Sequence, residues 1–461
     1  MRGVAIRPVR RMRSSPAGVS SPARVDAAKL GWVTGEVALA SYAGISTLYL
    51  LYYATEVLHL PAAWAGIAMF VPRLWNILGD PFIGFLSDRT RSRFGRRRPY
   101  LLAGAVIWGA AFWLLFNLPQ VEDPFARAGL FSFVFLLNNT GLTLFQVPYA
   151  AMLAEFSPDS AVRTRLAAYR EVAARVAILL TLAGAPRVLA RASNPAAGFG
   201  QVGTIFGAVI AVSGIIAFFA TAGAPATSPS TSHGGGRLQI APIIENRPFA
   251  SITLAFLFVN LGDAVFSGSL VYYVTEVMRK SPAIIGVLYP VSSLTGIAST
   301  PLWTLAANRL GRARVCRVAF AGNALCCTLP LLFGVQQLWL MYPFMSLYGL
   351  FNTGARLLPN AMVPDTVDLD RVRTGHNREG VFFGIFVFTQ QTAFAAGGFL
   401  LSLLLTLAGV GGAAHGAGRV TGILICFTVA SAALYGGAFL ASLFYRLHPS
   451  DLLKVAATRA A

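Results

Sequence analysis

The 461 residues are 56% hydrophobic and 12% charged, about half the charged fraction of an average soluble protein, so the composition excludes a soluble globular domain. The formal net charge is +19. The basic residues gather in short segments between apolar stretches and at the N-terminus, which is the positive-inside bias of membrane proteins and argues against nucleic-acid binding. We expect a multi-pass protein of the plasma or inner membrane.

The first stretch in chain order is an Arg- and Ser-rich segment, residues 1–30, which we interpret as a cytoplasmic tail, with a transit peptide over 1–28 as the alternative. Six apolar segments long enough to cross a bilayer follow, and the polar stretch "APATSPSTSHGGGR" then interrupts the pattern at 224–237. Six more apolar segments come after it. The twelve segments lie at about 31–56, 62–86, 100–118, 127–153, 170–192, 199–222, 249–278, 282–306, 315–334, 336–361, 381–409 and 418–446.

This order predicts an all-α polytopic membrane protein with twelve transmembrane helices in two six-helix bundles. The predicted parts are the bundles 31–222 and 249–446, a cytoplasmic linker 223–248 and a cytoplasmic tail 447–461.

An internal repeat relates the two bundles. The hexapeptide "YYATEV" at 52–57 returns as "YYVTEV" at 272–277, and the register persists at the same offset of 220 through Gly66 and Gly286 and through Pro81 and Pro301. A repeat of this length predicts two pseudo-symmetric halves. The Arg-rich loops place both termini in the cytoplasm and both hexapeptides at the outer face. The halves are then parallel repeats, which place a substrate site between them near the middle of the bilayer.

The most informative motif is "GDPFIGFLSDRTRSRFGRRRP" at 79–99. We expect Gly84 to let another helix approach closely and Asp88 to form a tight charged turn with the arginines, which locks helix ends together in one state of a cycle. The alternative is a set of topology signals without a gating role. The gate candidates, including two acids between segments 10 and 11, are Gly84, Asp88, Arg89, Gly95, Arg96, Asp365 and Asp368.

The pattern G-x-x-S-D-R followed by G-R-R-R resembles the signature loop of the major facilitator superfamily. The preceding Asp-Pro, the long turn and "MVPDTVDLDRVRTGHNREG" at 362–380 resemble its glycoside–pentoside–hexuronide:cation symporters, whose best-known member is the melibiose carrier. The resemblance covers essentially the whole chain. It implies the major facilitator fold and secondary active transport of a small solute, a sugar or glycoside, by alternating access.

The resemblance also implies four acidic site residues, and this chain keeps one of them. The family has two acids one turn apart on helix 2, where this chain has Asp80 and Asn76. The family's sugar-binding acids on helices 1 and 4 align near Ala40 and with Gln146 of this chain. A lysine expected on helix 11 aligns with Gln391. The coupling ion, proton or sodium, therefore stays open, and we expect no other cofactor.

Polar and ionisable residues inside membrane spans are expensive and are functional candidates by default. Arg73, Asn76 and Asp80 share one helical face and are the coupling-ion candidates; Arg73 could neutralise Asp80 in one conformation, or the two could form a structural ion pair. Glu171 and Arg175 could simply pair with each other. The substrate-cavity candidates are Asn138, Asn139, Gln146, Asn260, Asp263, Asn352, Arg356, Gln390 and Gln391.

Other classes of function find little support in the sequence. The chain has no H-E-x-x-H or G-x-S-x-G motif and no phosphate-binding loop, and its four cysteines show no metal-ligand spacing, so we expect neither an enzyme nor a metal site. Two alternatives remain: a carrier of lysolipids or other amphiphiles from the same branch, and a membrane receptor or scaffold that transports nothing. A polar, aromatic-lined cavity would favour a sugar, and a lateral apolar opening a lipid. We expect a monomer.

Overall fold

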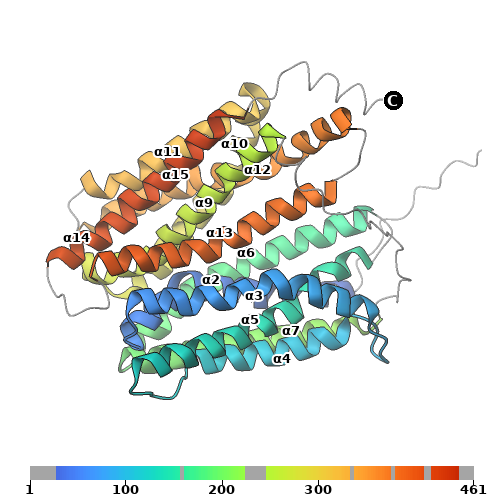
Figure 1. Ribbon diagram of the computed structural model, residues 1–461, viewed down its shortest axis with the longest axis horizontal. Helices are drawn as coiled ribbons and strands as arrows, with labels where there is room; N and C mark the ends of the chain where they lie inside the picture. Colours follow the sequence, from blue (N-terminus) through green and yellow to red (C-terminus); the bar gives the residue numbers. More distant parts are fainter. Residues whose placement is uncertain are drawn as a thin grey trace, which may run out of the picture.

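The computed structural model describes residues 27–155, 160–223, 246–332, 337–374, 379–409 and 417–445. Within these ranges every regular element is helical, and Figure 1 shows long helices running side by side in two groups, one from each half of the chain. Most of the predicted N-terminal tail, nearly all of the linker and the C-terminal tail lie outside the described residues.

Helices of the first half follow the predicted segments closely. They are α1 (Ala27–Val33), α2 (Gly35–Tyr52), the π-helix η1 (Tyr53–Val57), α3 (Ala62–Arg89), α4 (Arg98–Leu115), α5 (Pro124–Glu155), α6 (Ser160–Arg191), α7 (Pro195–Ala220) and a short 3₁₀ turn η2 (Thr221–Gly223). The largest difference is α6, which begins about ten residues before the apolar segment, because its first turns are charged and lie beyond the apolar stretch.

The second half repeats this order. Its helices are α9 (Arg247–Tyr272), the π-helix η3 (Tyr273–Val277), the 3₁₀ turn η4 (Pro282–Ile284), α10 (Ile285–Leu310), α11 (Arg312–Leu332), α12 (Leu338–Thr374), α13 (Glu379–Leu407), α14 (Ala417–Ile425), the π-helix η5 (Cys426–Ala430) and α15 (Ser431–Leu443). Helix α12 continues through residues 362–374, which were expected to be a loop.

Counting α1–η1, α9–η3 and α14–α15 as one span each, the described residues contain twelve long helices, as predicted. Ten of them are apolar enough to cross a membrane by composition alone. The other two, α3 and α12, carry polar side chains at mid-length, among them Arg73 and Asn76 in α3 and Asn352 and Arg356 in α12. Both helices carry predicted site residues, as do α5, α9 and α13.

The predicted repeat appears in the backbone itself. Both hexapeptides form a π-helix, at residues 53–57 and 273–277. The non-glycine residues His59 and Arg279, again 220 apart, both have φ of 52°, a conformation that such residues rarely adopt. The packing is repeated too: α2 packs on α6 and α7 as α9 packs on α13 and α15, and α3 and α4 pack on α5 as α10 and α11 pack on α12.

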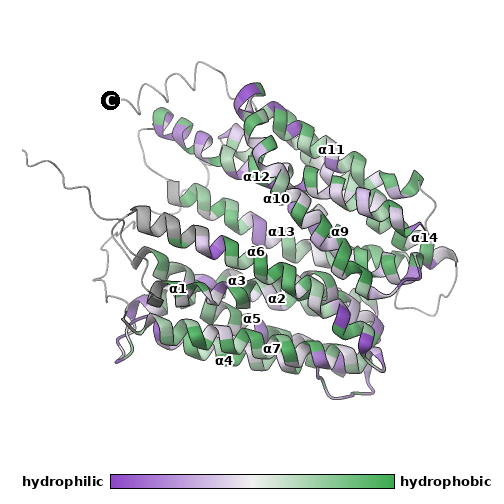
Figure 2. Ribbon diagram, turned by 180° about the vertical axis from the view of Figure 1, so that it is seen from behind, coloured by the Kyte–Doolittle hydropathy of each residue, from purple (hydrophilic) through white to green (hydrophobic). Residues whose placement is uncertain are grey.

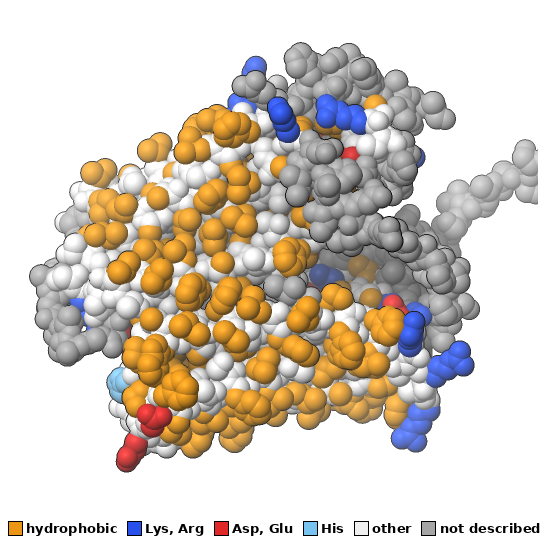
Figure 3. Space-filling view, viewed as in Figure 1, with side chains coloured by type: hydrophobic (Ala, Val, Ile, Leu, Met, Phe, Trp, Pro, Cys, Tyr) orange, Lys and Arg blue, Asp and Glu red, His pale blue; other side chains and the backbone are white. Residues whose placement is uncertain are grey.

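Side chains on the outer surface suit a lipid environment. Figure 2 shows that hydrophobic residues dominate along the helices and that hydrophilic ones gather toward their ends, and Figure 3 shows hydrophobic side chains spread over one face with Lys and Arg at one end. Large apolar residues are strongly exposed, for example Leu78, Phe133 and Leu180, whose exposed fractions lie between 64% and 70%. Such a belt would aggregate in water.

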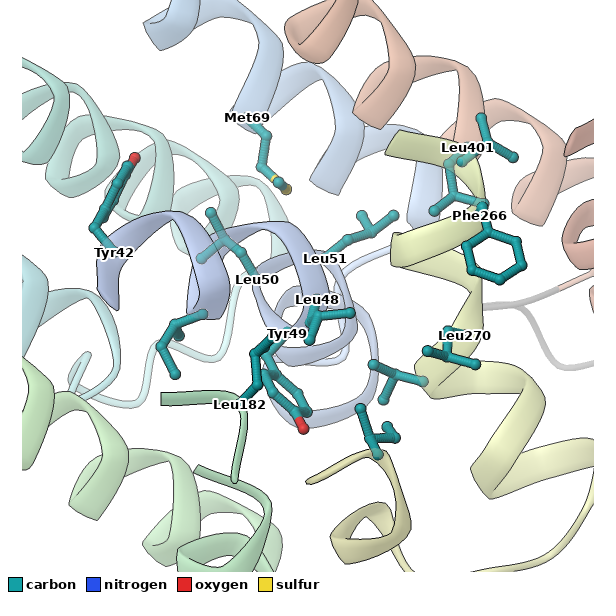
Figure 4. Close-up of a cluster of buried hydrophobic side chains, with 14 of the residues drawn as sticks. Tyr42, Leu48, Tyr49, Leu50, Leu51, Met69, Leu182, Phe266, Leu270 and Leu401 are labelled. Carbon is teal, nitrogen blue, oxygen red and sulfur yellow. The ribbon is translucent and has the colours of Figure 1, made fainter. Parts of the chain in front are cut away.

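The two halves join through the helix pairs α2 with α9, α3 with α13, and α6 with α10. Figure 4 shows buried residues of both halves around α2, among them Leu48 and Leu51 of the first half and Phe266, Leu270 and Leu401 of the second. We call the end of the molecule with the two hexapeptides the hexapeptide end, and the opposite end, with the α3–α4 loop, the loop end. Figure 3 shows a hollow between the halves at the loop end.

Candidate functional site

Three adjoining cavities lie between the halves, with volumes of about 460, 260 and 1060 Å³. Ala43 of α2 borders all three. The largest is lined toward the loop end by Glu36, Arg170 and Asn360. The other two extend deeper, one against α9, α10 and α12 and one against α3 and α5.

The cavity beside α3 and α5 holds the predicted coupling-ion residues. Asp80 accepts a hydrogen bond from the Thr143 hydroxyl, with 2.9 Å between Oγ1 and Oδ1, and the Gln391 side chain lies beside it in the same cavity. Asn76 Nδ2 lies 3.4 Å from Asn139 Oδ1. Asp80 and Gln391 belong to different halves, so this contact joins the two bundles.

Arg73 does not pair with Asp80 in this conformation. Its Nη1 donates to the backbone oxygen of Phe394, on α13 of the other half, over 3.0 Å. Arg73 and Asp80 are seven positions apart, which corresponds to a rise of about 10 Å along a helix, and the guanidinium is turned toward α13. The structural ion pair that was the alternative interpretation is therefore absent among the described residues.

A second polar cluster surrounds Asp263 of α9. Its Oδ1 accepts hydrogen bonds from Tyr435 OH at 2.6 Å, from Tyr348 OH at 3.3 Å and from Asn352 Nδ2, and its Oδ2 lies 3.2 Å from Arg356 Nη1. The Asp263 side chain is 6% exposed and that of Arg356 is 42% exposed. We call Asp263, Tyr348, Asn352, Arg356 and Tyr435 the Asp263 cluster. It joins α9, α12 and α15 of the second half.

Sequence reasoning missed both tyrosines of this cluster. Tyr348 precedes Asn352 by four residues and so lies on the same helical face, a signal that could have been used. Tyr435 had no such signal, because nothing in α15 indicates that it packs against α9.

The predicted cavity residues divide into two groups. Asn139, Gln146, Asp263, Asn352, Arg356, Gln390 and Gln391 line the three cavities. Asn138 and Asn260 do not, and both are fully buried. Neighbouring helical residues face directions about 100° apart, so Asn138 turns into helix packing where Asn139 faces the cavity. Asn260 donates to the Phe256 carbonyl of its own helix.

Further ion pairs lie nearer the loop end. Glu171 pairs with Arg175 over 2.7 Å on α6, as the simpler interpretation expected. Glu36 of α2 pairs with Arg170 over 2.9 Å. These paired charges border the largest cavity.

The α3–α4 loop contains the predicted charged turn. Asp88 pairs with Arg97 over 2.9 Å, and Gly95 has φ of 93°, which favours glycine. In the second half Gly311 has φ of 88°, and the next residue, Arg312, pairs with Asp365 over 2.7 Å.

Our expectation for Gly84 does not hold in this conformation. A Cβ at Gly84 would lie 3.6 Å from Val147 Cγ1, an ordinary contact, whereas a Cβ at Gly104 would lie 2.6 Å from the Phe145 backbone nitrogen. The closest helix approaches are made by other glycines.

One arginine links the halves at the hexapeptide end. Arg419 of α14 contacts both carboxylate oxygens of Glu56, at 3.0 and 2.9 Å, and lies 3.4 Å from Glu276. The two glutamates are the equivalent residues of the two hexapeptides. Thr55 Oγ1 and Tyr272 OH, 2.6 Å apart, add a second contact between the halves.

Twelve spans in two repeated bundles around a polar cavity define a multi-pass membrane transporter. The family model described as "MFS/sugar transport protein" matches residues 31–449, and the chain belongs to this family. It is therefore a secondary active transporter and not an enzyme.

Known proteins similar to this chain include two relatives that match most of its length. Inner membrane symporter YicJ of Escherichia coli is 26% identical over 93% of both chains. The sphingosine-1-phosphate transporter MFSD2B of Mus musculus is 25% identical over 82% of this chain and 80% of its own. Among solved structures, a point mutant of the nucleoside transporter NupG superposes with a TM-score of 0.67 at 12% identity, covering 91% of this chain and all of the other. This likeness concerns the fold.

Proposed function

We propose that the protein carries a sugar or glycoside by alternating access, one chain forming the whole transport unit. The observation that supports this most is the polar lining of the cavity between the halves. Hydroxyl, amide, carboxylate and guanidinium groups from both halves border it, with the aromatic rings of Tyr289, Tyr348 and Phe394 among them. A ring bearing several hydroxyl groups needs such a set of donors and acceptors beside apolar surface.

The conformation fits one stage of such a cycle. The halves are in contact at the hexapeptide end, and the cavity extends toward the loop end. The Arg-rich α3–α4 loop favours a cytoplasmic loop end, which makes this an inward-open state with both termini in the cytoplasm. The opposite state would require the halves to separate around Arg419.

We further propose that the coupling ion is a proton carried by Asp80. A sodium ion prefers several oxygen ligands and net negative charge, whereas Asp80 is the one carboxylate on its face of α3 and already accepts a hydrogen bond from Thr143. Both cross-half contacts in this region, from Gln391 to Asp80 and from Arg73 to Phe394, join α3 to α13. A rocking motion that breaks them would change the surroundings of Asp80, and so load or release a proton.

The similarity to the mouse transporter supports a second candidate substrate, a lysolipid or other amphiphile. One experiment separates the two. The purified protein in proteoliposomes is given labelled D-xylose, D-galactose, melibiose or lysophosphatidylcholine, with a pH gradient and then with a sodium gradient. Saturable sugar uptake supports the proposal. Uptake of the lysolipid alone favours the amphiphile carrier, and no flux of any probe contradicts both candidate substrates.

A further inference from the structure

Both oxygens of the Asp263 carboxylate already have hydrogen-bond donors among neighbouring side chains. Oδ1 accepts from three donors and Oδ2 faces the Arg356 guanidinium. A buried ion pair is costly unless further hydrogen bonds satisfy it, and the two tyrosines and Asn352 supply these. Because Asp263 is almost fully buried, it has little surface left to offer a ligand.

Arg356 is the member of the Asp263 cluster that faces open space. It borders both the 460 Å³ and the 1060 Å³ cavities and is 42% exposed. An arginine has five N–H donors in a planar fork. Within the described part of the chain, Arg356 uses Nη1 for Asp263, while Nε and Nη2 make no hydrogen bond. Its guanidinium carbon lies 6.0 Å from the centre of the Phe394 ring, at the limit of a cation–π contact.

We propose that Arg356 is a solute-binding residue, that Asp263 is its positioning residue, and that the ligand at this subsite is an uncharged polyhydroxylated ring. This deepens the proposed sugar transport and rests on it. Asp263 offsets the charge of Arg356, so the pair does not favour an anion over a neutral solute. Adjacent hydroxyl oxygens suit the free donors of a planar fork, and Phe394, which borders two of the cavities, supplies apolar surface beside them.

The Asp263 cluster lies entirely within one half of the molecule. Helices α9, α12 and α15 all belong to the second half, so the hydrogen bonds around Asp263 persist when the halves rock against each other. Arg356 then presents the same donors to the solute in both states, and only the side from which the solute arrives changes.

The test measures binding to the purified full-length protein in nanodiscs. The probes are D-glucose, D-galactose, D-xylose and methyl β-D-glucopyranoside, with D-glucuronate as the charged comparison. Variants are Arg356→Gln, Asp263→Asn and the double variant. The matched control is Arg317→Gln, since Arg317 also lies in the second half but borders none of the three cavities and donates to the Tyr445 carbonyl.

We expect Arg356→Gln to weaken binding of a neutral sugar by roughly tenfold or more, the usual effect of losing a hydrogen bond from a charged group. Asp263→Asn weakens it too, because Arg356 loses its position, and the double variant is no worse than Arg356→Gln alone. Arg317→Gln leaves binding unchanged. Since Arg356→Gln leaves Asp263 buried without its counter-charge and can unfold the chain, the double variant, in which both groups are neutral, provides the decisive comparison.

Three results would overturn the inference. If the double variant binds neutral sugars as the wild type does, the subsite is not at Arg356. If D-glucuronate alone binds and Asp263→Asn strengthens it, the site recognises an anion, because removal of the negative charge helps. If no sugar binds to the wild type, the proposed function itself fails, and the inference fails with it.

Discussion

Asp80 lies where the two halves meet, and its contacts come from both. The Thr143 hydroxyl belongs to the first half and the Gln391 amide to the second. Arg73, on the same face of α3, reaches across to the Phe394 carbonyl. A carboxylate with partners on both sides of a moving interface meets a different environment in each state of the cycle. This property distinguishes Asp80 from Asp263, whose partners all move with it.

At the residue scale we predict that Asp80→Asn abolishes accumulation driven by a pH gradient but leaves exchange of the solute across the membrane without a gradient. The reason is that the variant keeps the cavity but has no group that binds a proton. The measurement is solute uptake into proteoliposomes, and Glu122→Gln, at an exposed position in the loop before α5, is the control. Accumulation driven by sodium, or an unaffected variant, would contradict proton coupling; no accumulation of the wild type under either gradient would indicate a uniporter.

At the scale of the helices, close packing depends on a few glycines. Gly349 of α12 lies against the backbone of Ser292 in α10, with no room for a side chain between them. Gly104 and Gly141 do the same between α4 and α5. Small residues at helix crossings let backbones approach in membranes, where apolar burial drives association weakly.

We predict that Gly349→Ala destabilises the protein by about 1–3 kcal/mol, the usual cost of overpacking, because α10 and α12 must separate to accommodate the new methyl group. Gly84→Ala is the matched control, since a Cβ added at Gly84 would lie at an ordinary contact distance, 3.6 Å, from its nearest neighbour, Val147 Cγ1. Thermal unfolding in detergent measures both. An equal effect of the two substitutions would show that the crossing of α10 and α12 adapts freely.

The α3–α4 loop carries the next prediction. Asp88→Asn removes the ion pair with Arg97, whose side chain is 12% exposed, whereas Asp88 is 55% exposed. We expect transport to fall while expression and thermal stability stay near wild type, because the amide oxygen of Asn can still accept the hydrogen bond from Arg97 and the substituted group is largely in water. Transport assays and unfolding curves on the same preparation separate the two effects. Unchanged transport would show that the loop has no gating role and serves only as a topology signal.

At the scale of the whole molecule, the two hexapeptides form a contact between the halves. Their equivalent glutamates, Glu56 and Glu276, share Arg419. All three side chains are less than one-third exposed, so the charges are only partly screened by water. We interpret this group as a latch that favours the closed hexapeptide end.

We therefore predict that Arg419→Gln shifts the population toward states open at the hexapeptide end, because two neighbouring carboxylates then repel each other across the interface. Spin labels at Glu122→Cys and Lys280→Cys, one in each half at this end, would show longer distances; the four native cysteines are buried. The control is Arg187→Gln, whose arginine bonds to a carbonyl of its own helix. An unchanged distance distribution would show that Arg419 does not hold the halves together.

The sequence by itself determined the twelve helices, the repeat and the family, because the length of apolar segments and the match of two hexapeptides are local properties of the chain. It also identified Asp80, Asp263 and Arg356 as costly residues within spans.

Only the tertiary structure decided which partner each of these residues has. Arg73 bonds to Phe394 rather than Asp80, Asn138 is buried beside the cavity-lining Asn139, and Tyr435 reaches Asp263 from a helix 172 residues away in the chain. The direction that a helical side chain faces follows from the neighbours of its helix, and those neighbours are set by how the bundles pack.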